Sequence, residues 1–403
     1  MSKNIKLKNC ISSTYFNRNA YSKDKMRIEA VINNILPSIN KKKDTFHSLS
    51  KDFKLNFQYS DLEKFNKYKS VILIGMGGSV LGAKAIYSYC NDKIKKKFIF
   101  CDDLDQLKIE KIKKKINLKK NLFIIISKSG NTLETLINCN LLKDKINNKN
   151  TIIITDKKTN LLNTFAKNKK ILLINHKDYL GGRYSVLSEV GMVPAYFMGL
   201  KINDFRKNLL IFFSRKEKKL IQDSVIKLKQ IYKYKKIKSI ILLNYAPEIN
   251  DFLYWCQQLI AESLGKNGRG ILPVVSPAPR DHHSLMQLYL DGPKDKLFYI
   301  FSLQLNKKLK TNKNIFGKNF RYAAKKDISK IKQAQKNALI QVLKNKNIPY
   351  REFKINKKNE QSLSELFSYF IIETILIGKL IDVNPFDQPA VEQVKTLTKK
   401  YLS

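Results

Sequence analysis

From about residue 70 onward, short apolar runs alternate with longer segments of helical periodicity, and this pattern restricts the fold more than any other feature of the chain. Buried strands that alternate with helices form βαβ units and a parallel sheet. The alternation pauses in a helical region at about 190–235 and then begins again. The apolar runs lie at residues 71–74, 98–103, 121–126, 151–156, 170–176, 238–247, 271–277, 297–305 and 348–355. We therefore predict an α/β fold of two three-layer α/β/α sandwich domains with mainly parallel sheets.

The length of the chain agrees with two such domains. With 403 residues, of which 43% are hydrophobic, the chain can bury more than one core. Residues 1–45 have an amphipathic pattern unlike the rest, so we expect an N-terminal helical extension there. The first domain is predicted at 46–200 and the second at 201–383, and a C-terminal helical segment is predicted at 384–403.

The charge of the chain is strongly positive, with 77 Lys and Arg against 33 Asp and Glu and a formal net charge of +44. Such an excess is typical of nucleic-acid-binding proteins. Here 68 of the 77 basic residues are Lys, and they are spread from end to end. A surface that binds the phosphates of a nucleic acid would concentrate its charge and favour Arg, whose guanidinium forms bidentate hydrogen bonds. We interpret the excess as a composition bias on solvated faces and expect no nucleic-acid partner, although the mean field favours anionic substrates.

The apolar runs, the first residues and the cysteines of the sequence predict the location of the protein and the redox state of its thiols. No uninterrupted apolar run approaches the ~20 residues needed to cross a bilayer. The first 17 residues are polar and lack the apolar centre of a signal peptide. The five cysteines are scattered, at positions Cys10, Cys90, Cys101, Cys139 and Cys256. We expect a cytoplasmic protein with reduced thiols, no membrane contact and no metal site.

A glycine-rich turn follows the first apolar run, in the segment IGMGGSVLG. Gly75, Gly77 and Gly78 resemble a dinucleotide-binding fingerprint, and Asp102 and Asp103 end the next run where a ribose-binding acid would lie. The third glycine of that fingerprint would fall at position 80, which is Val80. The cluster alone is explained equally by a bound ligand and by a tight turn between strand and helix.

The segment SKSGNT at 127–132 lies between an apolar run and a predicted helix. Its three hydroxyls, on Ser127, Ser129 and Thr132, and its backbone N–H groups converge on a helix N-terminus. A phosphate monoester gains both hydrogen bonds and the helix dipole there. An ordinary N-cap would need only one such hydroxyl, so phosphate binding is the favoured interpretation. No GK[ST] motif follows, which disfavours a nucleoside triphosphate.

Two further clusters contain candidate charged residues. Arg183 lies among the glycines of GGRYSVLSEVG, just before an apolar helix. Gln258 and Glu262 are spaced i, i+4 on one face of a mostly apolar helix. A carboxylate on such a face must have a partner or a function if it is buried, because burying it alone is costly. The spacing alone leaves open that Glu262 faces solvent.

The remaining clusters hold histidines and C-terminal polar residues. His282 and His283 lie at a helix start in PRDHHSLMQL, with no companion ligands at metal spacing. Gln388 and Lys395 lie in NPFDQPAVEQVK, which by itself is a turn and a helix.

Taken together and in this order, the six segments resemble the glucose-6-phosphate isomerase family, which is built from two sugar-isomerase (SIS) domains. The resemblance extends from about residue 70 to the end of the chain. The matching segments are IGMGGSVLG, SKSGNTLET, GGRYSVLSEVG, QQLIAESLGK, DHHSLMQL and NPFDQPAVEQVK. The resemblance implies SIS-type domains, a sugar-phosphate substrate, and an aldose–ketose isomerisation in glycolysis and gluconeogenesis that needs no cofactor and no metal.

The resemblance also implies roles for individual residues. Glu262 corresponds to the catalytic base, Arg183 to the arginine that stabilises the enediolate, and His283 and Lys395 to the acid–base pair for ring opening. The C-terminal segment completes the active site. The residues that correspond to the family's substrate contacts are Gly78, Ser79, Ser127, Lys128, Ser129, Thr132, Gln258 and Gln388.

The resemblance also bears on how the chain assembles and on two alternative functions. In the family the ring-opening histidine enters the site from the neighbouring subunit, so we expect a homodimer with His283 contributed in trans. Gly130 and Asn131 make the 127–132 segment more similar to the loop of bifunctional glucose/mannose-6-phosphate isomerases, which is one alternative function. The other alternative is a non-catalytic SIS protein that senses sugar phosphates.

Overall fold

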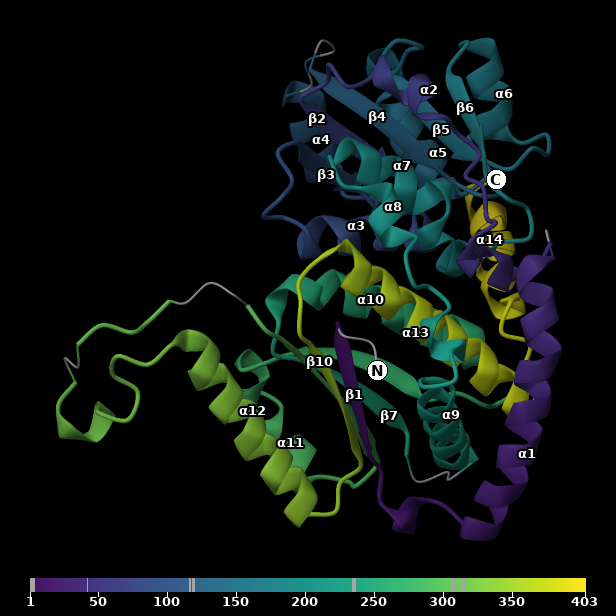
Figure 1. Ribbon diagram of the computed structural model, residues 1–403. Helices are drawn as coiled ribbons and strands as arrows, with labels where there is room; N and C mark the ends of the chain where they lie inside the picture. The colour runs from purple at the N-terminus through teal and green to yellow at the C-terminus, as the bar shows by residue number, and fades with distance from the viewer. Residues whose placement is uncertain are drawn as a thin grey trace.

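The computed structural model describes residues 4–403 except 42, 116, 118–119, 234–236, 306–308 and 314–315. Within this range two five-stranded sheets lie one above the other, with helices between them and on their outer faces (Figure 1). The predicted α/β class with mainly parallel sheets is confirmed.

The first sheet has the strand order β3-β2-β4-β5-β6, and all of its strands are parallel. Alternate residues of the strands face opposite helical layers, so both faces are buried and the strands are continuous apolar runs. The strands are β2 Ser70–Ile74, β3 Lys97–Cys101, β4 Asn121–Ile126, β5 Thr151–Thr155 and β6 Leu172–Asn175. The helices are α2 Tyr59–Glu63, α3 Leu81–Tyr89, α4 Gln106–Lys115, α5 Leu133–Leu141, α6 Leu161–Asn168 and α7 Glu189–Phe197.

The second sheet has the order β1-β10-β9-β7-β8 and is parallel except for β1 at its edge. Its strands are β1 Ile5–Cys10, β7 Ser239–Asn244, β8 Leu272–Pro277, β9 Lys296–Leu303 and β10 Tyr350–Ile355. The helices of this part of the chain are α8 Ile202–Phe205, α9 Lys218–Lys233, α10 Asn250–Leu264, α11 Met286–Asp291, α12 Ile328–Asn345 and α13 Glu360–Leu380. Every strand predicted from an apolar run is therefore present.

The N-terminal extension was predicted to be helical over 1–45, and this prediction is wrong for its first part. Helix α1 spans Arg18–Ile35, but Ile5–Cys10 is a strand that pairs antiparallel with β10. Ile5 and Leu7 point into the core while Lys6 and Lys8 do not, a period of two that fits a strand. The other predicted domain boundaries stay predictions, and residues 1–3 and 42 of the extension lie outside the described residues.

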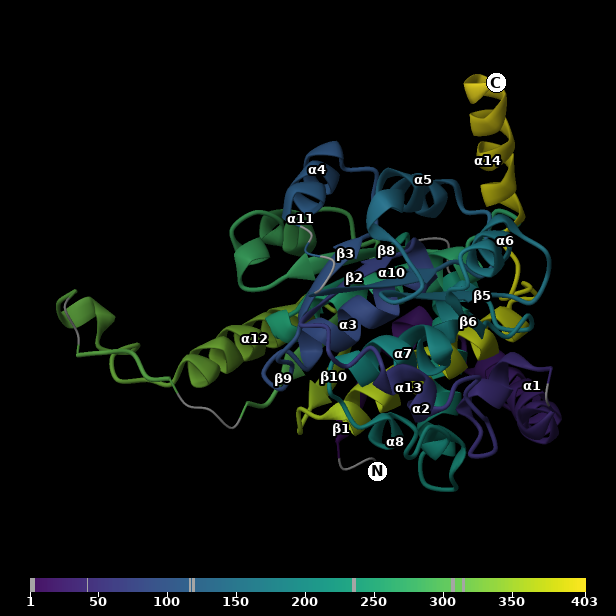
Figure 2. The ribbon, with the colours of Figure 1, turned by 90° about the horizontal axis from the view of Figure 1, so that it is seen from above.

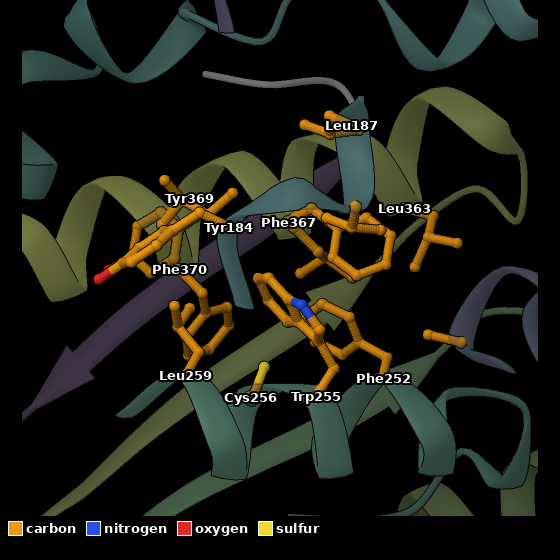
Figure 3. Close-up of a cluster of buried hydrophobic side chains, with 14 of the residues drawn as sticks. Tyr184, Leu187, Phe252, Trp255, Cys256, Leu259, Leu363, Phe367, Tyr369 and Phe370 are labelled. Atoms are coloured by element: carbon orange, nitrogen blue, oxygen red, sulfur yellow. The ribbon is translucent and has the colours of Figure 1, made fainter. Parts of the chain in front are cut away.

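A shared core joins the two halves of the chain between the sheets. Helix α10 packs against α3 from the first half and against α13 from its own. Figure 3 shows aromatic side chains of α10 and α13 in this core, and Trp255 meets Phe367 edge-on at 4.7 Å between ring centroids. Tyr184 and Leu187, which follow the first sheet, contribute to the same cluster. Because α10 carries Glu262, this shared core holds the candidate base between the two halves.

The last helix, α14 Pro389–Leu402, extends away from the rest of the chain (Figure 2). None of its residues is buried. Among the helices in the described ranges, none combines the length and the apolar character needed to span a lipid bilayer.

Candidate active site

Two glycine-containing turns touch where the halves of the chain meet. The first, Gly77–Ser79, follows β2, and the second, Gly182–Leu187, follows the last strand of the first sheet. A Cβ atom on Gly78 would lie 2.2 Å from the carbonyl carbon of Gly182, so only glycine permits this approach. The contact brings Arg183 beside the first turn and accounts for Gly78 without a dinucleotide.

Arg183 lies at the centre of the candidate site and is almost fully buried. Its Nη1 atom forms an ion pair with Glu262 Oε1 at 3.1 Å, and its Nε donates to Ser263 Oγ at 2.8 Å. The Glu262 side chain keeps 23% of its surface exposed, so it can reach both the guanidinium and a small molecule. The predicted base and the predicted anion stabiliser therefore lie in contact.

The other donors of Arg183 hold the segment 384–388, here named the strap. Nη2 donates to the carbonyl oxygens of Pro385 at 2.7 Å and Asp387 at 3.0 Å, and Nη1 donates to Gln388 Oε1 at 2.9 Å. Tyr184 adds a hydrogen bond from its hydroxyl to the Pro385 carbonyl at 2.9 Å. Burial raises the pKa of Tyr184, which keeps that hydroxyl protonated as a donor. Arg183 thus brings Gln388 to the candidate base.

Gln258 lies one helical turn before Glu262 on α10 and faces the first glycine turn. Its Nε2 atom is 2.8 Å from the position that a Cβ on Gly77 would occupy. Its Oε1 is buried and, within the described residues, has no hydrogen-bond partner. Buried polar atoms are normally satisfied, so an orphaned amide oxygen beside a turn of this kind fits a hydrogen bond from a ligand hydroxyl.

The 127–132 loop lies beside the first glycine turn, at the carboxyl end of β4. A Cβ on Gly75 would lie 3.0 Å from the Ile126 carbonyl oxygen and 3.2 Å from Ser79 Cβ, so the two segments are closely packed. The hydroxyls of Ser127 and Thr132 are hydrogen-bonded at 2.9 Å, and α5 begins directly after them. The Ser129 hydroxyl accepts a hydrogen bond from the nearby backbone N–H of Asn131, at 3.3 Å. Hydroxyls therefore gather at a helix N-terminus, as phosphate binding requires.

Lys128 does not join these hydroxyls. Its Nζ donates to the Asp178 carbonyl oxygen at 2.6 Å. Burial lowers the pKa of Lys128, with Asp156 and Asp178 acting in the opposite direction. In this conformation its ammonium group fixes the loop to the segment after β6, and its contact with substrate stays a prediction.

Gly130 and Asn131 dock the same loop onto α6. Gly130 has a positive φ of 63°, and a Cβ there would lie only 1.8 Å from Asn160 Oδ1. Asn131 Oδ1 accepts a hydrogen bond from the Leu161 backbone N–H at 3.1 Å. These contacts explain the two residues by packing within the chain, without recourse to a second sugar substrate.

We expect Gly130→Ala to weaken sugar-phosphate binding and to lower stability. The positive φ alone costs an Ala about 1–2 kcal/mol, and the clash with Asn160 must also move the loop. The matched control is Gly199→Ala, because Gly199 has a φ of 76° and a Cβ at that position would have nothing within 4 Å. Thermal unfolding and KM are the measurements. If the two variants lose the same stability and keep the same KM, the docking contact has no role.

The two neighbouring histidines differ in their surroundings. His282 Nε2 is hydrogen-bonded to the Tyr245 hydroxyl at 2.6 Å, and burial, followed by the neighbouring His283, lowers the pKa of His282. His283 is exposed, and its ring has no hydrogen bond or ion pair to any other described residue. His283 is therefore the histidine that is available to a ligand, and nothing within the described chain brings it to Glu262.

Lys395 is not brought to the site either. It lies on α14, exposed, and its ammonium pairs with Glu392 three residues earlier at 2.6 Å. Because α14 extends away from the rest of the chain (Figure 2), Lys395 has no contact with Arg183 or Glu262.

Sequence reasoning missed four residues that organise this site, namely Ser263, Tyr184, Lys266 and Asp387. Ser263 bonds both Arg183 and Tyr184, at 2.8 Å each. Lys266 pairs with Asp387 in the strap at 2.8 Å. Each missed residue lies within a matching segment, next to or within four positions of a predicted site residue. The signal that could have identified these residues is their position within the segments that resemble the family.

Comparisons with known proteins agree with this geometry. A family model described as phosphoglucose isomerase matches residues 18–403. The glucose-6-phosphate isomerase of Methanocaldococcus jannaschii is 33% identical over 358 residues, which cover 84% of this chain and 86% of that protein.

Two solved structures show the same fold. A hypothetical protein from Thermus thermophilus superposes with a TM-score of 0.85 at 22% identity, over 99% of this chain and 100% of that one. A glucose-6-phosphate isomerase from Chlamydia trachomatis gives a TM-score of 0.79 at 16% identity, over 100% and 89% respectively. The family match begins at residue 18, well before the first motif that carried the resemblance. The chain belongs to the phosphoglucose isomerase family.

Proposed function

We propose that this chain interconverts glucose 6-phosphate and fructose 6-phosphate. The observation that carries the proposal is the contact of a partly exposed carboxylate, Glu262, with a buried guanidinium, Arg183, beside the orphaned amide oxygen of Gln258. These are a base, an anion stabiliser and a hydroxyl acceptor, which are the groups that the proton-transfer step of an aldose–ketose isomerisation uses. The reaction belongs to glycolysis and gluconeogenesis, and the scattered free cysteines fit a cytoplasmic location.

Proton transfer between neighbouring carbons is the chemical step. Glu262 removes the hydrogen from C2 of the open-chain aldose as a proton, and the electrons of that bond form the C1–C2 double bond of an enediolate. As that double bond forms, the π electrons of the aldehyde move onto O1, and the hydroxyl proton of O2 is transferred to O1. Glu262 then returns its proton to C1 while the electrons on O2 form the new carbonyl. One carboxylate serves both steps, and a positioned base of this kind contributes about 10²–10⁴-fold.

The negative charge of the enediolate develops on O1 and O2, next to Arg183. The guanidinium is fixed by Ser263 and the strap before the substrate arrives, so it need not reorganise as the charge forms. A buried site strengthens this interaction. The phosphate group is distant from the reacting carbons and orients them through the hydroxyls of the 127–132 loop.

Ring opening needs an acid and a base apart from Glu262, and we assign it to His283 and Lys395. Both residues are exposed and neither contacts the Arg183–Glu262 pair within the chain. The assignment therefore includes a homodimer in which His283 of one subunit completes the site of the other.

Exposed apolar side chains on two projecting segments support such a dimer. Helix α14 exposes Val391, Val394, Leu397 and Tyr401, which recur at helical spacing on one side. The segment before α12 exposes Leu309, Phe316 and Tyr322 and extends away from the second sheet (Figure 1). Large apolar side chains gathered on projecting segments are typical of an interface. Around His283 itself, Leu288 is exposed, whereas Leu285, Met286 and Leu290 pack inside the second half of the chain.

A mixing experiment tests the contribution in trans. Chains carrying Glu262→Gln and chains carrying His283→Ala, each expected to be inactive alone, are unfolded and refolded together. In a two-fold dimer each heterodimer then holds one intact site and one doubly damaged site, so about a quarter of wild-type activity returns when exchange is random. Native mass spectrometry verifies the heterodimers. If they form and no activity returns, His283 acts in its own subunit.

Turnover of the purified chain tests the proposed function. Fructose 6-phosphate is supplied without nucleotide, and NMR spectroscopy separates glucose 6-phosphate from mannose 6-phosphate among the products. We expect glucose 6-phosphate to form faster. Faster formation of mannose 6-phosphate would favour the bifunctional enzyme, and binding without turnover would favour the sensing protein.

A further inference from the structure

The strap is held from two sides, one by Arg183 and the other by Lys266. Lys266 lies four residues after Glu262 and just beyond the end of α10 at Leu264. Its Nζ atom donates to the Asn384 carbonyl oxygen and forms an ion pair with Asp387 Oδ1 at 2.8 Å. The catalytic helix and the strap are thus joined directly.

The strap also bonds to itself around Asp387. The second carboxylate oxygen, Oδ2, accepts from Asn384 Nδ2 at 2.9 Å, and Asn384 Oδ1 accepts from the Phe386 backbone N–H at 3.1 Å. The hydrogen bond from Lys266 is the largest cause that lowers the pKa of Asp387, so the carboxylate stays ionised at neutral pH. Lys266 therefore binds a preformed turn at two of its atoms.

From these contacts we propose that Lys266 and Asp387 are a positioning pair that fixes the strap, and with it Gln388 and the start of α14, relative to Glu262. The inference rests on the proposed isomerase function. Asp387 contributes its carboxylate to Lys266 and its carbonyl oxygen to Arg183. Asp387 is therefore bonded both to Arg183, the candidate anion stabiliser, and to Lys266, which lies just beyond the end of α10.

The alternative is an ordinary surface ion pair, which contributes little. Lys266 differs from such a pair because its side chain is only 10% exposed and has a second acceptor in the strap. Its position also matters. Gln388, the residue after Asp387, bonds to Arg183 and is the residue before α14 begins, so a displaced strap would move a sugar-contacting amide and the helix that carries Lys395.

The chain offers a matched control in Lys358 and Asp92. These two residues form an ion pair at 2.7 Å with side-chain exposures of 16% and 50%, close to the 2.8 Å, 10% and 53% of Lys266 and Asp387. Lys358 has a second acceptor as well, Asn91 Oδ1. The control pair joins the segment after α3 to the segment before α13 and has no contact with the candidate site.

The experiment compares Lys266→Met, Asp387→Asn, Lys266→Arg and the control Lys358→Met in the full-length chain. Steady-state kinetics give kcat and KM, amide hydrogen exchange reports on residues 384–402, and thermal unfolding shows that each variant is folded. We expect Lys266→Met and Asp387→Asn to lower kcat roughly tenfold or more, because small misplacements in a site have large kinetic effects. KM should change by only about twofold, and exchange in 384–402 should become faster.

The conservative and control variants make the expectation specific. Lys266→Arg keeps the charge and should restore kcat and exchange toward the wild type, and Lys358→Met should change neither. The proposal is overturned if Lys266→Met and Asp387→Asn, both folded, keep the kcat of the Lys358→Met control. If the wild-type chain lacks isomerase turnover, the proposed function fails, and exchange alone then decides: faster exchange in 384–402 supports the positioning role, and unchanged exchange contradicts it.

Discussion

Replacing Glu262 by Gln should lower kcat by about 10²–10⁴-fold while sugar-phosphate binding persists. Gln has nearly the shape of Glu but cannot accept a proton, so the variant loses the base and keeps the packing of α10. Glu262 contacts Arg183 through one oxygen, Oε1, which the amide oxygen of Gln can replace. The loss should therefore appear in kcat, with KM little changed.

The control for this variant is Glu248→Gln, which removes a carboxylate just before the start of the same helix and outside the site. It should leave turnover unchanged. Near-normal turnover of a folded Glu262→Gln chain would mean that another group is the base.

We also expect Arg183→Lys to cause a large loss of kcat. The Arg183 guanidinium bonds to Ser263 and Gln388, to two backbone carbonyl oxygens of the strap, and to Glu262. A single ammonium group cannot reach this set of acceptors. Loss of a preorganised donor to a developing oxyanion costs about 10²–10³-fold in kcat, and unpaired strap carbonyls should also lower the thermal midpoint.

The control variant Arg351→Lys separates the loss of kcat from the loss of thermal stability. Arg351 is fully buried and pairs with Glu373 at 2.7 Å, as Arg183 pairs with Glu262, but it lies on β10 away from the candidate site. It should lower the thermal midpoint with little effect on kcat measured below that midpoint. An equal loss of kcat in both variants would show that Arg183 acts only through folding.

The sheets could be predicted because their strands are buried on both faces. In β4 and β5, Ile124 and Ile153 face opposite helical layers, so the strands are unbroken apolar runs that are visible without an alignment. β1 could not be predicted in the same way. It is a short edge strand in which lysines alternate with apolar residues, and its partner β10 lies about 340 residues later, so nothing local reveals the pairing.

The site was predictable to the extent that it depends on side-chain type within a motif. Glu262, Arg183 and Gln258 were expected and do lie together. What could not be predicted is the direction of flexible side chains and the convergence of distant segments. Lys128 turns toward Asp178, away from the hydroxyls, and Lys395 stays on an outlying helix. Such placements depend on tertiary contacts, which the spacing of residues along the sequence does not reveal.

If Glu262 moves a proton between C2 and C1, part of that hydrogen should exchange with solvent during turnover. The chain is incubated with glucose 6-phosphate and fructose 6-phosphate in deuterium oxide, and the C2 proton of glucose 6-phosphate is followed by NMR spectroscopy. Because the Glu262 side chain is 23% exposed, part of the transferred protons should be replaced by deuterons, and the loss accumulates over many turnovers. We predict that the C2 proton signal decays with the wild-type chain and persists with Glu262→Gln. Isomerisation with full retention of the C2 hydrogen, or equal decay with both chains, would mean that Glu262 does not transfer this proton.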